Sequence, residues 1–262
     1  MVFDRNPELY DRIRPGYPAK LFVEIVKHTG AGPGDRLLEI GCGTGKSTGW
    51  FAERGYQITA LEKGRNLAEF ARKKFANYPN LRVLNTPFED YESGGETYDI
   101  VFAGTSFHWI DREIAYSKSA ELLRSGGYLC LFWSNHIITR KTRKQFGALQ
   151  DAYRNNVPEW AAEYENNGPS ADTMRWESEL EISGMFERAA RKWFRFSVEY
   201  SASAYVDLLS TYSSHGALDE CVRQELFSEI EVIINNRFGG SIIKEYLTSL
   251  FIARKKKTVH QM

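Results

Sequence analysis

The sequence predicts an α/β fold with a doubly wound, mostly parallel sheet of seven strands and helices inserted towards the C-terminus. Short apolar segments alternate regularly with amphipathic helices between residues 36 and 133. The apolar segments are continuous rather than alternating, which is typical of strands covered on both faces. Right-handed crossovers between such strands then produce a doubly wound sheet.

Helices and strands follow one another in the first half of the chain, and glycines end three of the helices. Gly55 and the pair Gly126-Gly127 are expected to end the second and fourth helices of this segment. Strands are expected at residues 36–40, 57–61, 81–84, 99–103 and 128–133, and helices at residues 18–29, 46–54, 67–75 and 112–124.

The second half is less regular. Its clearest feature is the helical spacing of Leu218, Val222, Leu226 and Ile230, which predicts a long helix over residues 217–237. Other helices are expected at residues 142–155 and 201–212, a loop or lid at 156–172, and strands at 186–198 and 246–254.

The domain organisation expected from this order is one domain over residues 1–262. It begins with an N-terminal helical extension, residues 1–35, and continues with a cofactor-binding core, residues 36–135. Residues 140–240 would form a helical lid or substrate region, followed by closing strands to residue 256.

Charge and composition exclude several classes of partner. The 34 basic and 34 acidic side chains balance, so no electrostatic footprint for nucleic acid is expected. The basic run at residues 254–257 is interpreted as a solvated tail. No apolar segment is long enough to span a membrane, and the first residues lack a signal-peptide core.

Three widely separated cysteines, Cys42, Cys130 and Cys221, favour neither a disulfide framework nor a metal site. We therefore expect no metal and a cytoplasmic protein, as a monomer or homodimer.

A glycine-rich turn, Gly41-Cys42-Gly43-Thr44-Gly45, follows the first expected strand. A phosphate-binding Walker loop would need glycine where Ile40 stands. The dinucleotide fingerprint would need its third glycine at Lys46. What remains is an acidic residue, Glu39, at the end of a strand, followed by Gly-x-Gly-x-Gly before a helix.

This arrangement resembles motif I of the class I S-adenosylmethionine-dependent methyltransferases, in the branch similar to methyltransferase type 11. The resemblance implies S-adenosylmethionine as cofactor, with Gly41, Gly43 and Gly45 approached closely by it and Glu39 reaching its ammonium end. A strand-to-helix turn without a ligand is the alternative for the same residues.

The resemblance continues after the second and third expected strands. Glu62 lies about twenty residues beyond the turn, where the family binds both ribose hydroxyls, and Lys63 follows it. Pro87, Phe88 and Glu89 match the loop that contacts adenine, although Phe88 is also a candidate core residue.

After the fourth expected strand, Ala103, Gly104 and Thr105 would line the methionine part of the cofactor. Phe107, His108 and Trp109 match a His-Trp element of the same branch and are assigned to the acceptor site. Residues 122–129 resemble the Leu-x-Pro-Gly-Gly motif before the fifth strand, with Ser125 in place of proline.

The ends of the chain extend the resemblance. Tyr10 and Arg14 match an N-terminal signature that folds over the cofactor, and Arg14 could pair with its carboxylate. The branch closes its sheet with an antiparallel hairpin and inserts helices, here residues 201–237. His136 and Tyr212 are further candidates for binding the acceptor.

The activity that the resemblance implies is transfer of a methyl group to a small-molecule acceptor by direct in-line displacement. A base is needed only where the acceptor must lose a proton, and the candidates in order are His108, His136 and His215. A non-catalytic or regulatory protein with the same fold is the alternative function. An NAD enzyme and a nucleic-acid methyltransferase are less favoured, and the acceptor and the methylated atom stay open.

Overall fold

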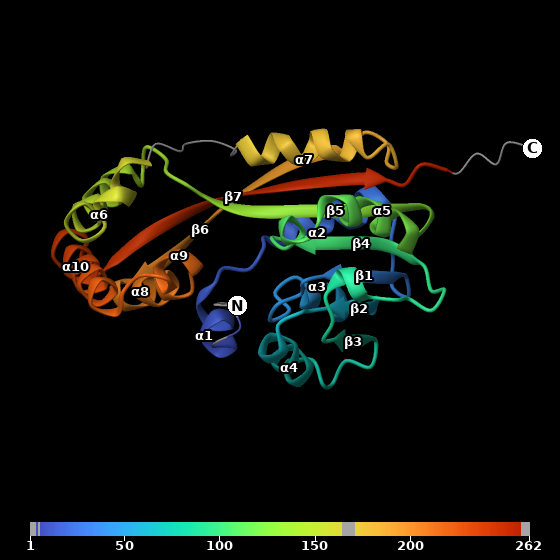
Figure 1. Cartoon of the computed structure of the whole chain (residues 1–262), viewed down its shortest axis with the longest axis horizontal. Helices are drawn as coiled ribbons and strands as arrows, with labels where there is room; N and C mark the ends of the chain where they lie inside the picture. The colour runs from blue at the N-terminus through green and yellow to red at the C-terminus, as the bar shows by residue number, and fades with distance from the viewer. Residues whose placement is uncertain (1–3, 5, 164–170, 258–262) are drawn as a thin grey trace, which may run out of the picture. The chain divides into compact units, whose positions relative to one another are not determined.

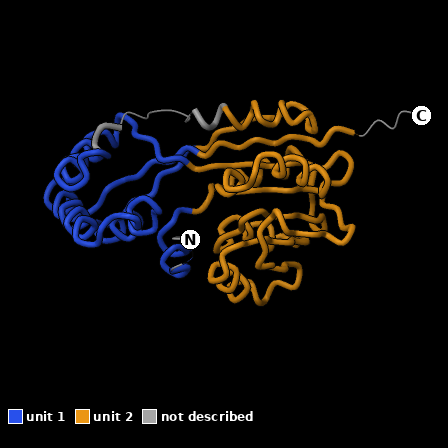
Figure 2. The backbone as a smooth tube through the Cα atoms, viewed as in Figure 1, with its two compact units in different colours: residues 1–15, 135–170, 195–247 blue, residues 16–134, 171–194, 248–262 orange. Residues whose placement is uncertain are grey.

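The structure is a computed structural model that describes residue 4, residues 6–163 and residues 171–257. The chain divides into two compact units, coloured separately in Figure 2. Unit 1 comprises residues 1–15, 135–170 and 195–247, and unit 2 comprises residues 16–134, 171–194 and 248–262.

The elements alternate between helix and strand up to residue 137, as Figure 1 shows. They are α1 (Pro7–Ile13), α2 (Ala19–Thr29), β1 (Arg36–Ile40), α3 (Thr48–Ala52), β2 (Gln57–Leu61), α4 (Arg65–Lys74), β3 (Leu81–Leu84), η2 (Phe88–Asp90), β4 (Tyr98–Gly104), η3 (Phe107–Trp109), α5 (Arg112–Leu122) and β5 (Leu123–Ile137). The later elements are α6 (Arg143–Asn156), η4 (Pro158–Glu163), α7 (Ala171–Ile182), β6 (Ala190–Ser201), α8 (Ala202–Ser210), α9 (Ser213–Gly216), α10 (Glu220–Phe238) and β7 (Ser241–Arg254).

The strands form one seven-stranded sheet in the order β3-β2-β1-β4-β5-β7-β6. The pairs β1–β2, β1–β4, β2–β3 and β4–β5 are all parallel. An isolated antiparallel bridge joins Phe186 to Lys255, next to the C-terminal end of β7. The predicted doubly wound sheet of seven strands is confirmed, with the order of the strands reversing at β1 and β4.

The core of unit 2 lies on both faces of the sheet because neighbouring residues of each strand point to opposite faces. Leu37 and Phe102 belong to the cluster that includes side chains of α2, α3 and α4. Leu38 and Val101, one position away, belong to the cluster that includes side chains of α5 and η2. This two-sided burial explains why the strands read as continuous apolar segments in the sequence.

Unit 1 has a core of its own, built from α6, α8 and α10 against residues of β6 and β7. Leu226 and Ile230 of α10 are completely buried there, which confirms the helical spacing seen in the sequence. Leu218 and Val222 pack against the same cluster but stay partly exposed. Leu218 precedes the first residue of the helix.

Several boundaries differ from those predicted. The fifth strand begins at Leu123 and continues through Gly126-Gly127, whereas the sequence predicted a helix to 124 and a strand over 128–133. The Lys255 amide donates to the Gly127 carbonyl at 2.8 Å, so pairing with the neighbouring strand overrides the glycine signal. Similarly, β7 begins at Ser241, five residues earlier than predicted.

The predicted loop over residues 156–172 is wrong at both ends. Pro158–Glu163 forms a 3₁₀ helix, and α7 begins at Ala171. Residues 164–170 of that predicted loop lie outside the described residues. The sequence pattern missed α7 because its apolar positions are few and separated by charged residues.

The basic run at residues 254–257 was predicted to be a solvated tail. This prediction is wrong for its first three residues. Arg254 ends β7, and its Nε donates to the Gly126 carbonyl at 3.3 Å. Lys255 and Lys256 donate to the carbonyls of Leu123 and Gly184. These three basic side chains therefore donate hydrogen bonds to backbone carbonyls beside the end of the sheet.

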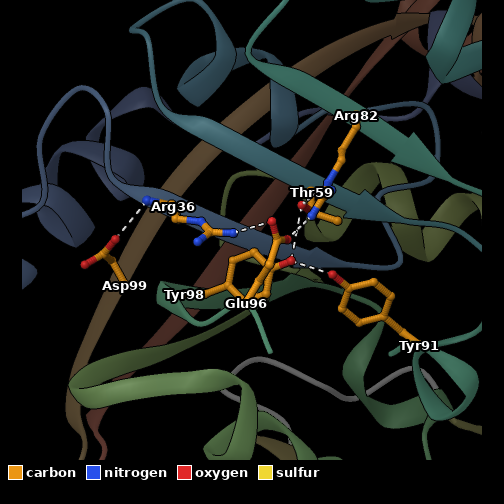
Figure 3. Close-up of polar contacts among 7 residues, drawn as sticks. All are labelled: Arg36, Thr59, Arg82, Tyr91, Glu96, Tyr98 and Asp99. Atoms are coloured by element: carbon orange, nitrogen blue, oxygen red, sulfur yellow. Dashed lines mark hydrogen bonds and ion pairs between the residues drawn. The ribbon is translucent and has the colours of Figure 1, made fainter. Parts of the chain in front are cut away.

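A polar network surrounds the amino ends of β1, β3 and β4 (Figure 3). Glu96 forms ion pairs with both Arg36 and Arg82. Beside it, the hydroxyls of Tyr91 and Tyr98 lie 2.5 Å apart in a buried hydrogen bond. Opposite charges and hydroxyls thus satisfy one another at this edge of the sheet, and Figure 3 shows further bonds to Thr59 and Asp99.

No helix among the residues that the structure describes is both long and apolar enough to cross a membrane.

Candidate functional site

The glycine-rich turn lies at the carboxyl end of β1, where ligands bind in open α/β sheets. Gly41, Gly43 and Gly45 all have positive φ, between 57° and 81°. A Cβ on Gly41 would lie 2.6 Å from Ser106 Cβ, and one on Gly45 would lie 2.2 Å from the Phe75 ring. The turn therefore needs glycine both for its backbone conformation and for space.

Glu39 is the second-to-last residue of β1 and is nearly inaccessible, with 1% of its surface exposed. Its carboxylate accepts hydrogen bonds from the hydroxyls of Ser47 and Thr48, at the start of α3. Burial raises the pKa of Glu39 to about 7, although the two hydroxyls act in the opposite direction. Glu39 thus ties the strand to the following helix, and its predicted contact with the cofactor ammonium stays a prediction.

Glu62, at the carboxyl end of the neighbouring β2, accepts hydrogen bonds from two backbone amides. One oxygen accepts from the amide of Gly43 at 2.8 Å and the other from the amide of Gly64 at 2.7 Å. A carboxylate has about four lone-pair positions, and in this type of site it accepts hydrogen bonds from ribose hydroxyls. The glycines without Cβ and this carboxylate fit an adenosyl group at this edge of the sheet.

Asn85 is a positioning residue that the sequence reasoning missed. Its side-chain amide donates to the carbonyl of Glu62 at 2.9 Å and to the carbonyl of Lys63 at 3.1 Å. The side chain of Lys63 itself is exposed. An asparagine directly after a buried strand was the available signal, since its amide can bond backbone groups of the adjacent loop.

In the loop after β3, the candidate adenine contacts have different environments. Phe88 is 3% exposed and packs in the core, which agrees with the alternative prediction that it is a core residue. Pro87 and Glu89 are half-buried, and the Glu89 carbonyl accepts from Lys118 at 2.7 Å. Of the three, Pro87 and Glu89 retain accessible surface for a ligand.

After β4, the backbone is strained at Thr105, which has a φ of 57° although it is not glycine. The Thr105 amide donates to the Phe132 carbonyl at 2.8 Å, and its hydroxyl lies 2.9 Å from that of Tyr17. Gly104 allows this approach, because a Cβ there would lie 2.5 Å from the Phe132 ring. Ala103 is fully buried beneath them.

Strain in a loop at the carboxyl edge is typical of functional sites. Tyr17 was not among the predicted residues; the aromatic-rich N-terminal signature pointed to Tyr10 instead.

The η3 turn holds the three candidate acceptor residues. Phe107 is buried, whereas His108 and Trp109 are exposed, Trp109 by 59%. The indole Nε1 of Trp133 donates to His108 Nδ1 at 3.2 Å. Because an indole nitrogen only donates, Nδ1 is the acceptor and the neutral ring carries its proton on Nε2.

This tautomer changes what His108 can do. A neutral imidazole accepts a proton only at its unprotonated nitrogen, which here faces Trp133. The arrangement favours donation from Nε2 over proton removal, and the predicted role of His108 as base stays a prediction. The indole of Trp133 is itself held by a stacked Trp176 ring from α7, 4.6 Å away.

The other predicted residues lie in unit 1. Arg14 donates to the hydroxyl and the carbonyl of Thr211, at 2.8 and 2.9 Å. Its guanidinium lies over the ring of Tyr212 at 4.2 Å and over that of Tyr10 at 5.3 Å. The structure therefore brings Tyr10, Arg14 and Tyr212 together within unit 1.

Two further histidines of unit 1 are surrounded by aromatic rings. Burial, and then the charge of Lys244, lower the pKa of His136 to about 2 and that of His215 to about 4. His215 also lies 2.9 Å from the Tyr153 hydroxyl. Both are weak bases near neutral pH, since an effective base has a pKa close to the working pH. Among the described residues, no cluster of three or more His, Cys, Asp or Glu could hold a metal.

Comparison with known families identifies the segment that carries this geometry. A family model described as "Methyltransferase domain" matches residues 38–131, from β1 to β5. Over 130 residues the chain is 32% identical to a probable S-adenosylmethionine-dependent methyltransferase of Saccharomyces cerevisiae, covering 47% of this chain and 43% of that protein. The chain thus matches less than half the length of the first curated relatives.

Two other relatives show how far the similarity extends. An uncharacterized methyltransferase of Schizosaccharomyces pombe is 24% identical over 86% of this chain and 84% of its own. A malonyl-[acyl-carrier protein] O-methyltransferase of Ilyobacter polytropus is 30% identical over 48% of this chain and 47% of its own.

Solved structures share the fold at low sequence identity. A structure from Anaeromyxobacter dehalogenans, named as a proposed type II methyltransferase, is 17% identical with a TM-score of 0.66, covering 93% of this chain and 99% of that one. The YcgJ protein of Bacillus subtilis is 14% identical with a TM-score of 0.55, covering 92% and 100%. The predicted fold is confirmed, and the motifs that resemble a methyltransferase lie within the segment that matches the methyltransferase domain model.

Proposed function

We propose that the chain is a class I S-adenosylmethionine-dependent methyltransferase that transfers a methyl group from this cofactor to a small-molecule acceptor, which the match of residues 38–131 to a methyltransferase domain supports. The single observation that carries the proposal is the carboxyl edge of β1 and β2. There, a glycine turn without room for a Cβ at Gly41 and Gly45 meets the Glu62 carboxylate, which already accepts a hydrogen bond from the Gly43 amide.

The residues of this edge have separate tasks in the proposed reaction. Glu62 accepts hydrogen bonds from the ribose hydroxyls, and the glycine turn lets the backbone approach the cofactor. Gly104 and Thr105 border its methionine part, with Thr105 held by Tyr17. The bound cofactor supplies an activated methyl on a sulfonium, so the protein needs chiefly to align the acceptor for direct displacement.

The candidate bases support an acceptor that does not depend on proton removal by histidine. His108 has its unprotonated nitrogen turned to Trp133, and the low pKa values of His136 and His215 make both poor bases. An acceptor oxygen that is already ionised meets this condition. A carboxylate is the simplest such group, and one relative is named an O-methyltransferase of a malonyl group.

A methyl-transfer assay with fractionated extracts tests the proposal. The chain is incubated with methyl-labelled S-adenosylmethionine and, separately, the small-molecule, protein and nucleic-acid fractions. Label is expected in the small-molecule fraction, with Glu62→Gln as a variant of reduced activity. Label confined to protein or nucleic acid would contradict the proposed acceptor class. Cofactor binding without transfer to any fraction would favour the non-catalytic alternative.

Trp133→Phe tests the proposed donor role of His108. Loss of the indole N–H removes the donor that makes Nδ1 the acceptor, so the proton on Nε2 is no longer fixed by Trp133 and turnover is expected to fall. Unchanged turnover in Trp133→Phe together with full loss of activity in His108→Gln would assign His108 a different role.

A further inference from the structure

Lys244 of β7 is a charged side chain buried within unit 1. Only 2% of its surface is exposed, and its Nζ donates to the Tyr212 hydroxyl at 3.2 Å. Among the side chains that the structure describes, those of residues 4, 6–160 and 175–257, no carboxylate forms an ion pair with it. A buried ammonium is costly unless an opposite charge compensates it, so Lys244 calls for a counter-anion from outside the described chain.

Aromatic rings surround Lys244 but carry no negative charge. The Nζ lies 5.3 Å from the ring centre of Tyr212, 5.5 Å from that of Tyr205 and 6.0 Å from that of Tyr246. At these distances the faces of the rings attract a cation only weakly compared with a carboxylate. They form apolar walls that would exclude water from a bound anion and so strengthen its attraction to the ammonium.

A second cation contacts the same ring. The guanidinium of Arg14 lies over Tyr212 at 4.2 Å, so the ring is in contact with two positively charged groups. The neighbouring histidines add no negative charge, and Lys244 contributes to the lowered pKa values of both His136 and His215. The surroundings of Tyr212 thus hold two positive charges in an aromatic environment.

We propose that Lys244 anchors a carboxylate-binding site within unit 1. This site does not depend on the proposed function, because its contacts all come from unit 1. One ammonium balances one negative charge, which matches a carboxylate better than a doubly charged phosphate. The Tyr212 hydroxyl is an additional hydrogen-bond group within reach of an anion bound at Nζ.

Ligand-observed NMR on the full chain tests the site without requiring turnover. The probes are acetate, malonate, citrate and benzoate, each compared with its neutral amide at constant ionic strength, with inorganic phosphate as a competitor. At least one carboxylate is expected to bind more tightly than its amide. Lys244→Met should weaken it about tenfold or more, the usual scale for losing a charge-assisted hydrogen bond. Lys144→Met, an exposed lysine of α6 in the same unit, is the matched control.

The outcomes separate this site from the proposed function. Equal binding of every carboxylate and its amide, or equal carboxylate binding by Lys244→Met and the wild type, would overturn the site. Tighter binding of phosphate than of any carboxylate would overturn the assigned ligand class. If Lys244→Met fails to fold, Lys244→Arg and Tyr212→Phe replace it; retained preference in the first and weaker binding in the second support the site. Cofactor binding, measured by calorimetry in the same proteins, tests the proposed function independently.

Discussion

The two edges of the sheet in unit 2 are built on opposite principles. At the amino edge, Glu96 pairs with two arginines, and buried tyrosine hydroxyls bond one another (Figure 3). At the carboxyl edge, three glycines and Thr105 have positive φ, and burial raises the pKa of Glu39 to about 7. The polar groups of the amino edge bond to one another, whereas the carboxyl edge holds a strained backbone and the buried carboxyl group of Glu39.

This difference indicates where selection for function acts on the fold. Strained backbone and perturbed carboxyl groups cost stability, and they persist where a ligand or a reaction requires them. Compensated ion pairs and hydroxyl networks do not need a ligand to explain them. Variants at the carboxyl edge should therefore change stability, cofactor binding or both, and those at the amino edge should change stability alone.

The largest effect is expected for Gly45→Ala. The new Cβ would lie 2.2 Å from the Phe75 ring at a φ of 81°, so clash and backbone strain add. We expect the free energy of unfolding to fall by about 4 kcal/mol, measured by urea denaturation. Gly94→Ala is the control, because its φ is also positive but its Cβ would meet nothing within 4 Å. Its expected loss is about 1 kcal/mol, and equal losses would refute the space requirement.

Glu39→Gln should alter how stability depends on pH. Burial raises the pKa of Glu39 from 4.5 to about 7, so its favourable contribution is complete below pH 4.5 and is lost as pH rises through 7. Glutamine cannot ionise, and the variant should lack about 3 kcal/mol of the wild-type decrease over that interval. Thermal denaturation between pH 4.5 and 8 measures it. Parallel curves for the two proteins would show that Glu39 is not the titrating group.

Glu62→Gln should weaken cofactor binding while the protein stays folded. Glutamine keeps one acceptor oxygen but loses the charge and one of the two amide bonds to Gly43 and Gly64. We expect affinity for S-adenosylmethionine to fall about tenfold by calorimetry. Asp90→Asn removes an exposed carboxylate nearby and should leave affinity unchanged. Unchanged affinity in Glu62→Gln would contradict the ribose assignment.

Tyr91→Phe should produce the smallest effect, and at the amino edge. It removes the hydroxyl that lies 2.5 Å from that of Tyr98, while Tyr98 still bonds Thr59. We expect a loss of about 1 kcal/mol in the free energy of unfolding. Cofactor affinity should equal that of the wild type. A change in affinity would contradict the expectation that amino-edge variants affect stability alone.

Part of the site could be predicted from the sequence because its motifs are local. Glycines at residues 41, 43 and 45 and an acid twenty residues later are dictated by short-range backbone requirements, and they appear at the expected strand ends. Asn85 and Tyr17 were missed because their roles depend on partners from other segments. The protonated nitrogen of His108 likewise depends on Trp133, which is 25 residues away.

The sequence by itself determined the sheet and the glycine turn, because apolar periodicity and backbone freedom are local properties of the chain. Tertiary structure alone decided the outcome where distant segments meet. It extended β5 through two glycines, gave the basic run its carbonyl partners and raised the pKa of Glu39. It also buried Lys244 among tyrosines from separate elements, since desolvation and charge balance depend on everything that packs around a group.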